Sequence, residues 1–175
     1  LFRSEQATPA YTALNPNQTV PLLVEGDFRL TESAAILKYL AEQCGSSAYP
    51  ADLRERARVN ALMDWFNTGV MRDLAYGVVY PQVMPHLRRA DEAAQQAHLA
   101  WSRPLAQRWL ALLNDHLLGD GRPFLAGRRI TLADYFAIGP MLLPELLGED
   151  WARWPQIRRW LRGLKARPGF QRSHR

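Results

Sequence analysis

The sequence has little cysteine and no long apolar segment. Cys44 is the single cysteine of the 175 residues, which excludes an internal disulfide framework and suits a reducing compartment. No apolar run approaches the ~20 residues that a membrane-spanning helix needs, so we expect no membrane partner. The hydrophobic content of 47% and the charged content of 22% are ordinary for a globular protein. This length allows one domain or two small ones.

Signatures of metal, nucleotide and hydrolase sites are also lacking. The four histidines have neither i,i+4 spacing nor the Cys/His spacing of a zinc site, so we expect no metal. The chain has no glycine-rich phosphate loop and no serine–histidine–aspartate pattern with a nucleophile elbow. These absences argue against hydrolases, kinases and nucleotide-dependent enzymes.

The C-terminal part is strongly basic. From Arg153 onward there are eight basic and no acidic side chains. Such a run is found in nucleic-acid and membrane patches, and also on the solvated face of a terminal helix. The tryptophans nearby recur at helical spacing, which favours burial over base stacking, and no nucleic-acid motif accompanies them. We therefore expect a solvated face and no nucleic-acid partner.

The first 45 residues mix helix and strand patterns. Pro21 lies near the start of a strand-like run, where proline is normally excluded because it cannot donate to the ladder, so the run predicts an edge with free backbone groups. The turn Glu25-Gly26-Asp27 then leads back toward a helix that begins after Thr31 as N-cap. The predicted elements are a helix over 7–14, strands over 20–24 and 28–30, and a helix over 32–44.

That helix ends at Gly45, which occupies the usual C′ position. Ile36, Leu37, Leu40 and Cys44 mark its apolar stripe. Cys44 is either a reactive thiol or a buried structural cysteine, and its place on the stripe favours burial.

Beyond a polar linker at 45–50, every pattern is helical. Pro104 is expected to kink or split one long helix, and Pro155 to open the last one. Thr131-x-x-Asp134 has the spacing of a capping box. The predicted helices cover 54–84, 91–118, 130–141 and 154–166. The outline is a small α+β piece joined to an all-helical domain.

Several motifs in this order resemble one family. Asn15-Pro-Asn-Gln-Thr-Val-Pro-Leu-Leu-Val24, followed by Leu30-Thr-Glu-Ser-Ala-Ala-Ile-Leu-Lys-Tyr-Leu40, closely resembles the glutathione-binding domain of the soluble glutathione transferases. Pro81-Gln-Val83 and Phe124-Leu-Ala-Gly-x-x-Ile-Thr-Leu-Ala-Asp-Tyr135 resemble that family's helical domain. The similarity covers about residues 1–170 and is closest to the theta, delta and bacterial classes.

The resemblance implies an α+β protein, in which the C-terminal half of a thioredoxin-like domain precedes an all-α helical bundle. The implied boundaries are 1–45 for the partial thioredoxin-like domain, 46–52 for a linker and 53–175 for the helical domain. A β-α-β segment of about 40 to 50 residues is then expected upstream of Leu1. In this family that segment carries the Ser, Tyr or Cys that activates the thiol, so no catalytic residue is named.

The resemblance also gives five residues roles in binding glutathione. Pro21 would follow a cis Val-Pro bond, and the Val20 N–H and C=O would pair with the cysteinyl backbone of glutathione. Glu32 would bind the γ-glutamyl ammonium. Ser33 and the helix N-terminus would bind the γ-glutamyl carboxylate, and Gln18 would contact the tripeptide. In isolation, helix capping would explain Glu32 and Ser33 more simply.

The implied activity is transfer of the glutathione thiolate, a co-substrate rather than a bound cofactor, to a small hydrophobic electrophile. Met71, Arg72 and Tyr76 are the residues expected to line the pocket for this second substrate, and Arg72 could stabilise developing negative charge. A core methionine, a surface ion pair and a packed tyrosine are the structural alternatives for these three positions.

Two other functions remain open on the same fold. One is a non-catalytic binding or interaction module, and the other is a glutathione-dependent thiol or peroxide reductase. The resemblance further implies a homodimer, a cytoplasmic location and a detoxification role.

Overall fold

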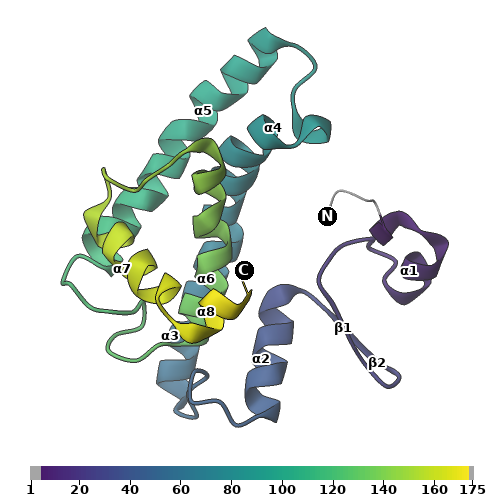
Figure 1. Cartoon of the computed structure of the whole chain (residues 1–175), viewed down its shortest axis with the longest axis vertical. Coiled ribbons are helices and arrows are strands. Elements are labelled where there is room, and N and C mark those ends of the chain that lie inside the picture. Colours follow the sequence, from purple (N-terminus) through teal and green to yellow (C-terminus); the bar gives the residue numbers. More distant parts are fainter. Residues whose placement is uncertain (1–4, 174–175) are drawn as a thin grey trace. The chain divides into compact units, whose positions relative to one another are not determined.

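The computed structural model describes residues 5–173, and its contacts divide the chain into two units between Tyr49 and Pro50 (Figure 1). The first is a small α+β unit and the second is entirely helical among its described residues.

The first unit is built around a two-stranded antiparallel hairpin. Leu22 pairs with Thr31 and Glu25 with Phe28, so the residues before the first strand and those after the second strand lie at the same end. The unit contains η1 (Glu5–Ala7), α1 (Pro9–Leu14), β1 (Leu22–Glu25), β2 (Phe28–Thr31) and α2 (Ser33–Gln43).

Two predictions for this unit are wrong. Thr31 is the last residue of β2 and not the N-cap of α2, because the chain turns sharply at Glu32, whose φ is +69°. Cys44 is exposed rather than buried, since Ile36 and Ala41 are the residues of α2 that are buried. Gly45 has the positive φ expected at the end of the helix.

The helical unit begins with one long rod. Asp52 caps it, its carboxylate accepting hydrogen bonds from the N–H groups of Arg54 and Glu55. Its middle has π-helical geometry, which the sequence pattern did not predict. The rod consists of α3 (Leu53–Asp64), η2 (Trp65–Val79) and α4 (Tyr80–Val83), and the 3₁₀ turn η3 (Pro85–Leu87) follows.

A second long helix packs along η2 (Figure 1). Pro104 lies inside it without splitting it. The last predicted helix begins at Pro155 as expected, but a further short helix follows where the sequence indicated an end. These elements are α5 (Glu92–Ala111), η4 (Leu112–Leu117), α6 (Leu132–Leu142), η5 (Leu143–Leu147), α7 (Pro155–Lys165) and α8 (Pro168–Ser173).

The core of this unit surrounds α6, which contacts α3, η2 and α7. Thr131 and Asp134 form the predicted capping box. The Asp134 carboxylate accepts hydrogen bonds from the backbone N–H groups of Thr131 and Leu125, both at 2.9 Å, and from Trp160 Nε1 at 3.0 Å. Asp134 is fully buried, and this burial raises the pKa of its carboxyl group. One side chain thus joins α6 to the preceding loop and to α7.

We expect the substitution Asp134→Asn to lower the free energy of unfolding by about 3 kcal/mol, because an amide cannot accept from all of these donors and leaves some unsatisfied. Urea unfolding monitored by circular dichroism measures the change. Asp64→Asn is the matched control, since Asp64 is an exposed helical carboxylate of the same unit. Equal losses in the two variants would contradict the structural role of Asp134.

Candidate functional site

The loop that precedes β1 is fixed by a buried asparagine. Asn15 is 1% exposed, and its Nδ2 donates a hydrogen bond to the Thr19 carbonyl at 2.8 Å. The Tyr11 hydroxyl donates to the same carbonyl at 2.6 Å. Gln18, an exposed residue of this loop, has a φ of +55°. The loop therefore has a defined shape.

Val20 and Pro21 lie between this loop and β1, and the predicted cis bond between them is confirmed. The side chain of Val20 is 53% exposed. Among residues 5–173, the Val20 N–H and C=O have no hydrogen-bond partner, because the ladder of the hairpin starts at Leu22. A short extended segment with free backbone groups is what an added peptide strand requires.

Glu32 and Ser33 lie at the N-terminus of α2. Glu32 is exposed and its side chain makes no capping hydrogen bond, so capping does not occupy this carboxylate. Its φ of +69° is rare for a residue with a long side chain. Ser33 is half-buried in the first turn, where the N–H groups lack intrahelical partners.

The hairpin brings these residues together. Leu22 pairs with Thr31, so Val20 and Pro21 lie at the same end of the sheet as Glu32 and Ser33. This end offers free backbone groups, an exposed carboxylate, a hydroxyl and a helix N-terminus. Such a set can bind a short peptide that carries both an ammonium and a carboxylate group.

The three residues predicted for the second-substrate pocket are all on η2 of the other unit. Met71 is half-buried, Arg72 is exposed and Tyr76 is 55% exposed. The Tyr76 ring packs edge-on against that of Tyr80, with the ring centroids 4.9 Å apart. Spacings of four and five residues place all three side chains near one face of a π-helix.

A buried carboxylate that the sequence did not reveal holds Arg72. The Arg72 Nε and Nη2 donate to the two oxygens of Asp73 at 2.7 and 2.9 Å. Asp73 is only 5% exposed, and Trp109 Nε1 of α5 donates to it at 2.6 Å. Pairing with Arg72 lowers the pKa of Asp73, while burial acts in the opposite direction. The guanidinium is therefore fixed in direction while its other face stays in solvent.

Gly69 makes this arrangement possible. A Cβ atom at position 69 would lie 2.9 Å from the Trp109 ring, closer than side chains can approach. Only glycine therefore lets the indole reach Asp73. No local pattern in the sequence indicates this contact, because residues 73 and 109 are far apart in the chain.

Over residues 5–173, no group of three or more His, Cys, Asp and Glu side chains is arranged to hold a metal ion. No helix in this range is long and apolar enough to cross a bilayer.

Two family models match the chain. The model described as the glutathione S-transferase N-terminal domain matches residues 2–42, and the one described as the glutathione S-transferase C-terminal domain matches residues 76–168. The chain belongs to the glutathione S-transferase family. The matches confirm the expected fold class, in which a thioredoxin-like N-terminal domain precedes an all-helical C-terminal domain.

Individual relatives agree with this assignment. Human glutathione S-transferase theta-1 is 32% identical over 184 residues, covering 99% of this chain and 74% of that protein. Glutathione S-transferase D6 of Drosophila melanogaster is 28% identical, covering 98% of this chain and 76% of that protein. A glutathione transferase homolog from Sulfitobacter, solved with bound glutathione, has the same fold, with a TM-score of 0.79 at 22% identity over 97% of this chain and 79% of that chain.

The match to residues 2–42 shows that the N-terminal domain is present in the chain. It therefore gives no support to the expectation that the β-α-β part of this domain is missing. The roles expected for individual site residues remain predictions.

The paired Asp73 predicts a pH effect. Because the pKa of Asp73 is lower in the folded protein, its ionised carboxylate stabilises the folded state at pH values above about 3.9, the ordinary pKa of an aspartate. This contribution is lost as the pH falls through the pKa of Asp73 in the folded state. We therefore expect Asp73→Asn to reduce the decline in the free energy of unfolding as the pH falls below about 4. Urea unfolding at a series of pH values measures this slope.

Asp64→Asn, which removes an exposed carboxylate of the same rod, serves as the control and should keep the wild-type slope. If the Asp73 variant and the wild type lose stability in parallel, the pairing with Arg72 does not operate in solution.

Proposed function

We propose that this chain acts as a glutathione S-transferase that joins the glutathione thiolate to small hydrophobic electrophiles. The observation that carries the proposal is at one end of the hairpin, where the backbone of Val20 and the side chains of Glu32 and Ser33 offer polar groups without a described hydrogen-bond partner. Membership of the family supports the reaction class.

In this proposal the cysteinyl backbone of glutathione pairs with the N–H and C=O of Val20 as a short antiparallel strand. Both groups are free among the described residues, and Pro21 cannot donate a competing N–H. Gln18 lies two residues earlier, exposed, and contacts the tripeptide from the loop. Bound glutathione in the Sulfitobacter homolog supports this choice of ligand.

The γ-glutamyl end of glutathione carries an ammonium and a carboxylate, and the site has a partner for each. Glu32 binds the ammonium through its exposed carboxylate, which makes no helix-capping hydrogen bond. Ser33 and the first N–H groups of α2 bind the carboxylate, where the helix dipole favours an anion. Glu32 has a positive φ, a backbone conformation of the kind that is often found at ligand sites.

The reaction forms a carbon–sulfur bond. The sulfur of the thiolate donates an electron pair to an electrophilic carbon, and the electrons of the bond that breaks move to the leaving group or acceptor. Met71 and Tyr76 supply apolar contact area for the electrophile, and Arg72 stabilises the negative charge that develops on it. We assign no thiol-activating side chain.

We further propose that the protein is a cytoplasmic homodimer with a role in detoxification, as the resemblance implies. The single cysteine suits a reducing compartment. For the domains we retain 1–45, 46–52 and 53–175 as boundaries.

Conjugation is the direct test. We expect the protein to be retained on immobilised glutathione and to conjugate glutathione with chlorodinitrobenzene, followed by the absorbance of the product. Retention without conjugation would instead indicate an interaction module. If the protein is not retained and does not conjugate glutathione, the proposal is refuted.

Replacement of Glu32 tests the ligand site. We expect Glu32→Gln to weaken glutathione binding about tenfold or more, because a charge-assisted hydrogen bond is lost, with little change in stability at this exposed position. Isothermal titration calorimetry measures the affinity. Asp27→Asn removes an exposed carboxylate at the opposite end of the hairpin and should leave binding unchanged. Equal effects of the two substitutions would exclude a specific role for Glu32.

A further inference from the structure

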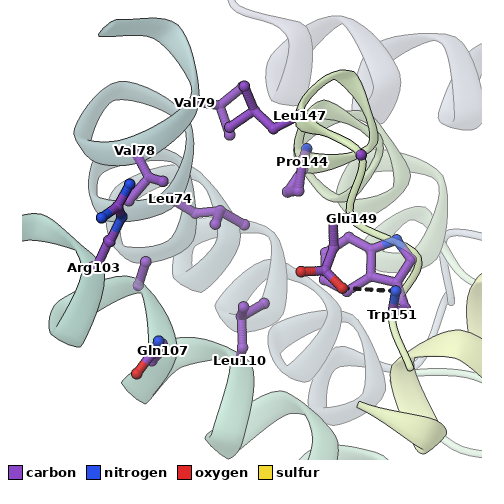
Figure 2. A pocket seen from close by; sticks show the side chains of 12 residues that line it. Leu74, Val78, Val79, Arg103, Gln107, Leu110, Pro144, Leu147, Glu149 and Trp151 are labelled. Carbon is purple, nitrogen blue, oxygen red and sulfur yellow. Dashed lines mark hydrogen bonds between the residues drawn. The ribbon is translucent and has the colours of Figure 1, made fainter. Parts of the chain in front are cut away.

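The helical unit contains a cavity of about 300 Å³ that none of the eight predicted site residues lines (Figure 2). Its interior is apolar and buried, and its polar groups lie at the edge. A cavity of this size and composition suits a small organic ligand. The lining comes from three elements: η2 with Leu74, Val78 and Val79, α5 with Arg103, Ala106, Gln107 and Leu110, and η5 with the following loop, with Pro144, Leu147, Gly148, Glu149 and Trp151.

One wall is held rigidly by Trp151, which is 3% exposed. Its backbone N–H donates to Glu149 Oε1 at 2.7 Å, and its indole Nε1 donates to Glu145 Oε1 at 3.1 Å. Glu145 is in turn paired with Lys165 of α7 at 2.6 Å. The wall is therefore preformed, because its position is fixed by hydrogen bonds within the helical unit.

Backbone strain marks the same wall. Trp151 has a φ of +63°, which is unfavourable for a bulky residue and persists only where the surrounding structure enforces it. The other non-glycine residues with positive φ in the described part of the chain are Gln18 and Glu32, both in the proposed glutathione site. Strain of this kind clusters at ligand sites.

The opposite wall carries an unpaired cation. Arg103 and Gln107 project from α5 at the edge of the cavity (Figure 2), and neither has a hydrogen bond or ion pair with another described residue. Across from them, Glu149 uses one carboxylate oxygen for the Trp151 N–H, and its other oxygen has no described partner. The cavity thus has the hydrogen-bond donors of the Arg103 guanidinium on one side and the free carboxylate oxygen of Glu149, an acceptor, on the other.

We propose that this cavity binds a small amphipathic monocarboxylate with a hydrogen-bond donor at its far end. The carboxylate pairs with the guanidinium of Arg103, whose planar fork matches it. The apolar body fills the space between Leu74, Leu110 and Trp151. The donor binds the second oxygen of Glu149, which also repels any second anionic group and so excludes dianions.

Three probes of one shape test these contacts by isothermal titration calorimetry on the whole chain, without glutathione or electrophile. The probe 3-(4-hydroxyphenyl)propanoate has both polar ends, 3-phenylpropanoate lacks the hydroxyl donor, and 4-ethylphenol lacks the carboxylate. We expect the first to bind most tightly, with a Kd below about 1 mM. No heat beyond dilution at that concentration would overturn the proposal.

Two variants separate the contacts. Arg103→Gln should weaken binding of both acids about tenfold and leave 4-ethylphenol unchanged, because only the acids pair with the guanidinium. Glu149→Gln should reduce the preference for the hydroxylated acid over 3-phenylpropanoate, because a neutral amide is the weaker acceptor.

Arg108→Gln is the matched control, since Arg108 is an exposed arginine of the same helix that does not line the cavity. It should leave all three affinities unchanged. If Arg103→Gln and Arg108→Gln lower the affinities for the acids equally, the acids are attracted to the general positive charge of α5 and the proposal is overturned. The proposal is also overturned if Arg103→Gln lowers the affinity for 4-ethylphenol as much as the affinities for the acids.

Discussion

The helical unit depends on the carboxylate of Asp134. Its hydrogen bonds come from the loop at Leu125, the start of α6 at Thr131 and the indole of Trp160 on α7. A buried carboxylate is tolerated only when its lone pairs are satisfied, so each of the three segments must be in place for the others to pack. Because α6 in turn contacts η2, this group also contributes to the packing of the helix that carries Arg72.

The proposed glutathione site and the cavity share one feature, which is backbone strain. Gln18, Glu32 and Trp151 all have positive φ, and each is held there by neighbouring groups rather than by its own preference. In the hairpin unit Asn15 and the start of α2 supply the restraint, and in the helical unit Glu145 and Glu149 do so. Strained residues surrounded by satisfied hydrogen bonds give a binding surface its shape before the ligand arrives, which lowers the entropy lost on binding.

Local chemistry could be predicted from the sequence, and long-range contacts could not. The hairpin, the capping box at Thr131 and the start of α7 at Pro155 all depend on residues a few positions apart. The bond between Asp73 and Trp109 and the strain at Trp151 depend on packing between elements distant in the chain, for which one sequence carries no signal. The exposure of Cys44 was missed for the same reason, since an apolar stripe indicates burial only where a neighbour covers it.

This difference has a consequence for specificity. The proposed glutathione contacts are backbone groups and adjacent side chains of one hairpin, so they are specified together by a short segment. Arg72, in contrast, is oriented by Asp73, which also accepts a hydrogen bond from Trp109. The Trp109 ring can approach Asp73 because Gly69 has no side chain in its way. A substitution at any of these positions would redirect the guanidinium without changing a residue of the hairpin. In the proposed function, the preference for the second substrate can therefore change through packing alone, while the groups proposed to bind the tripeptide stay the same.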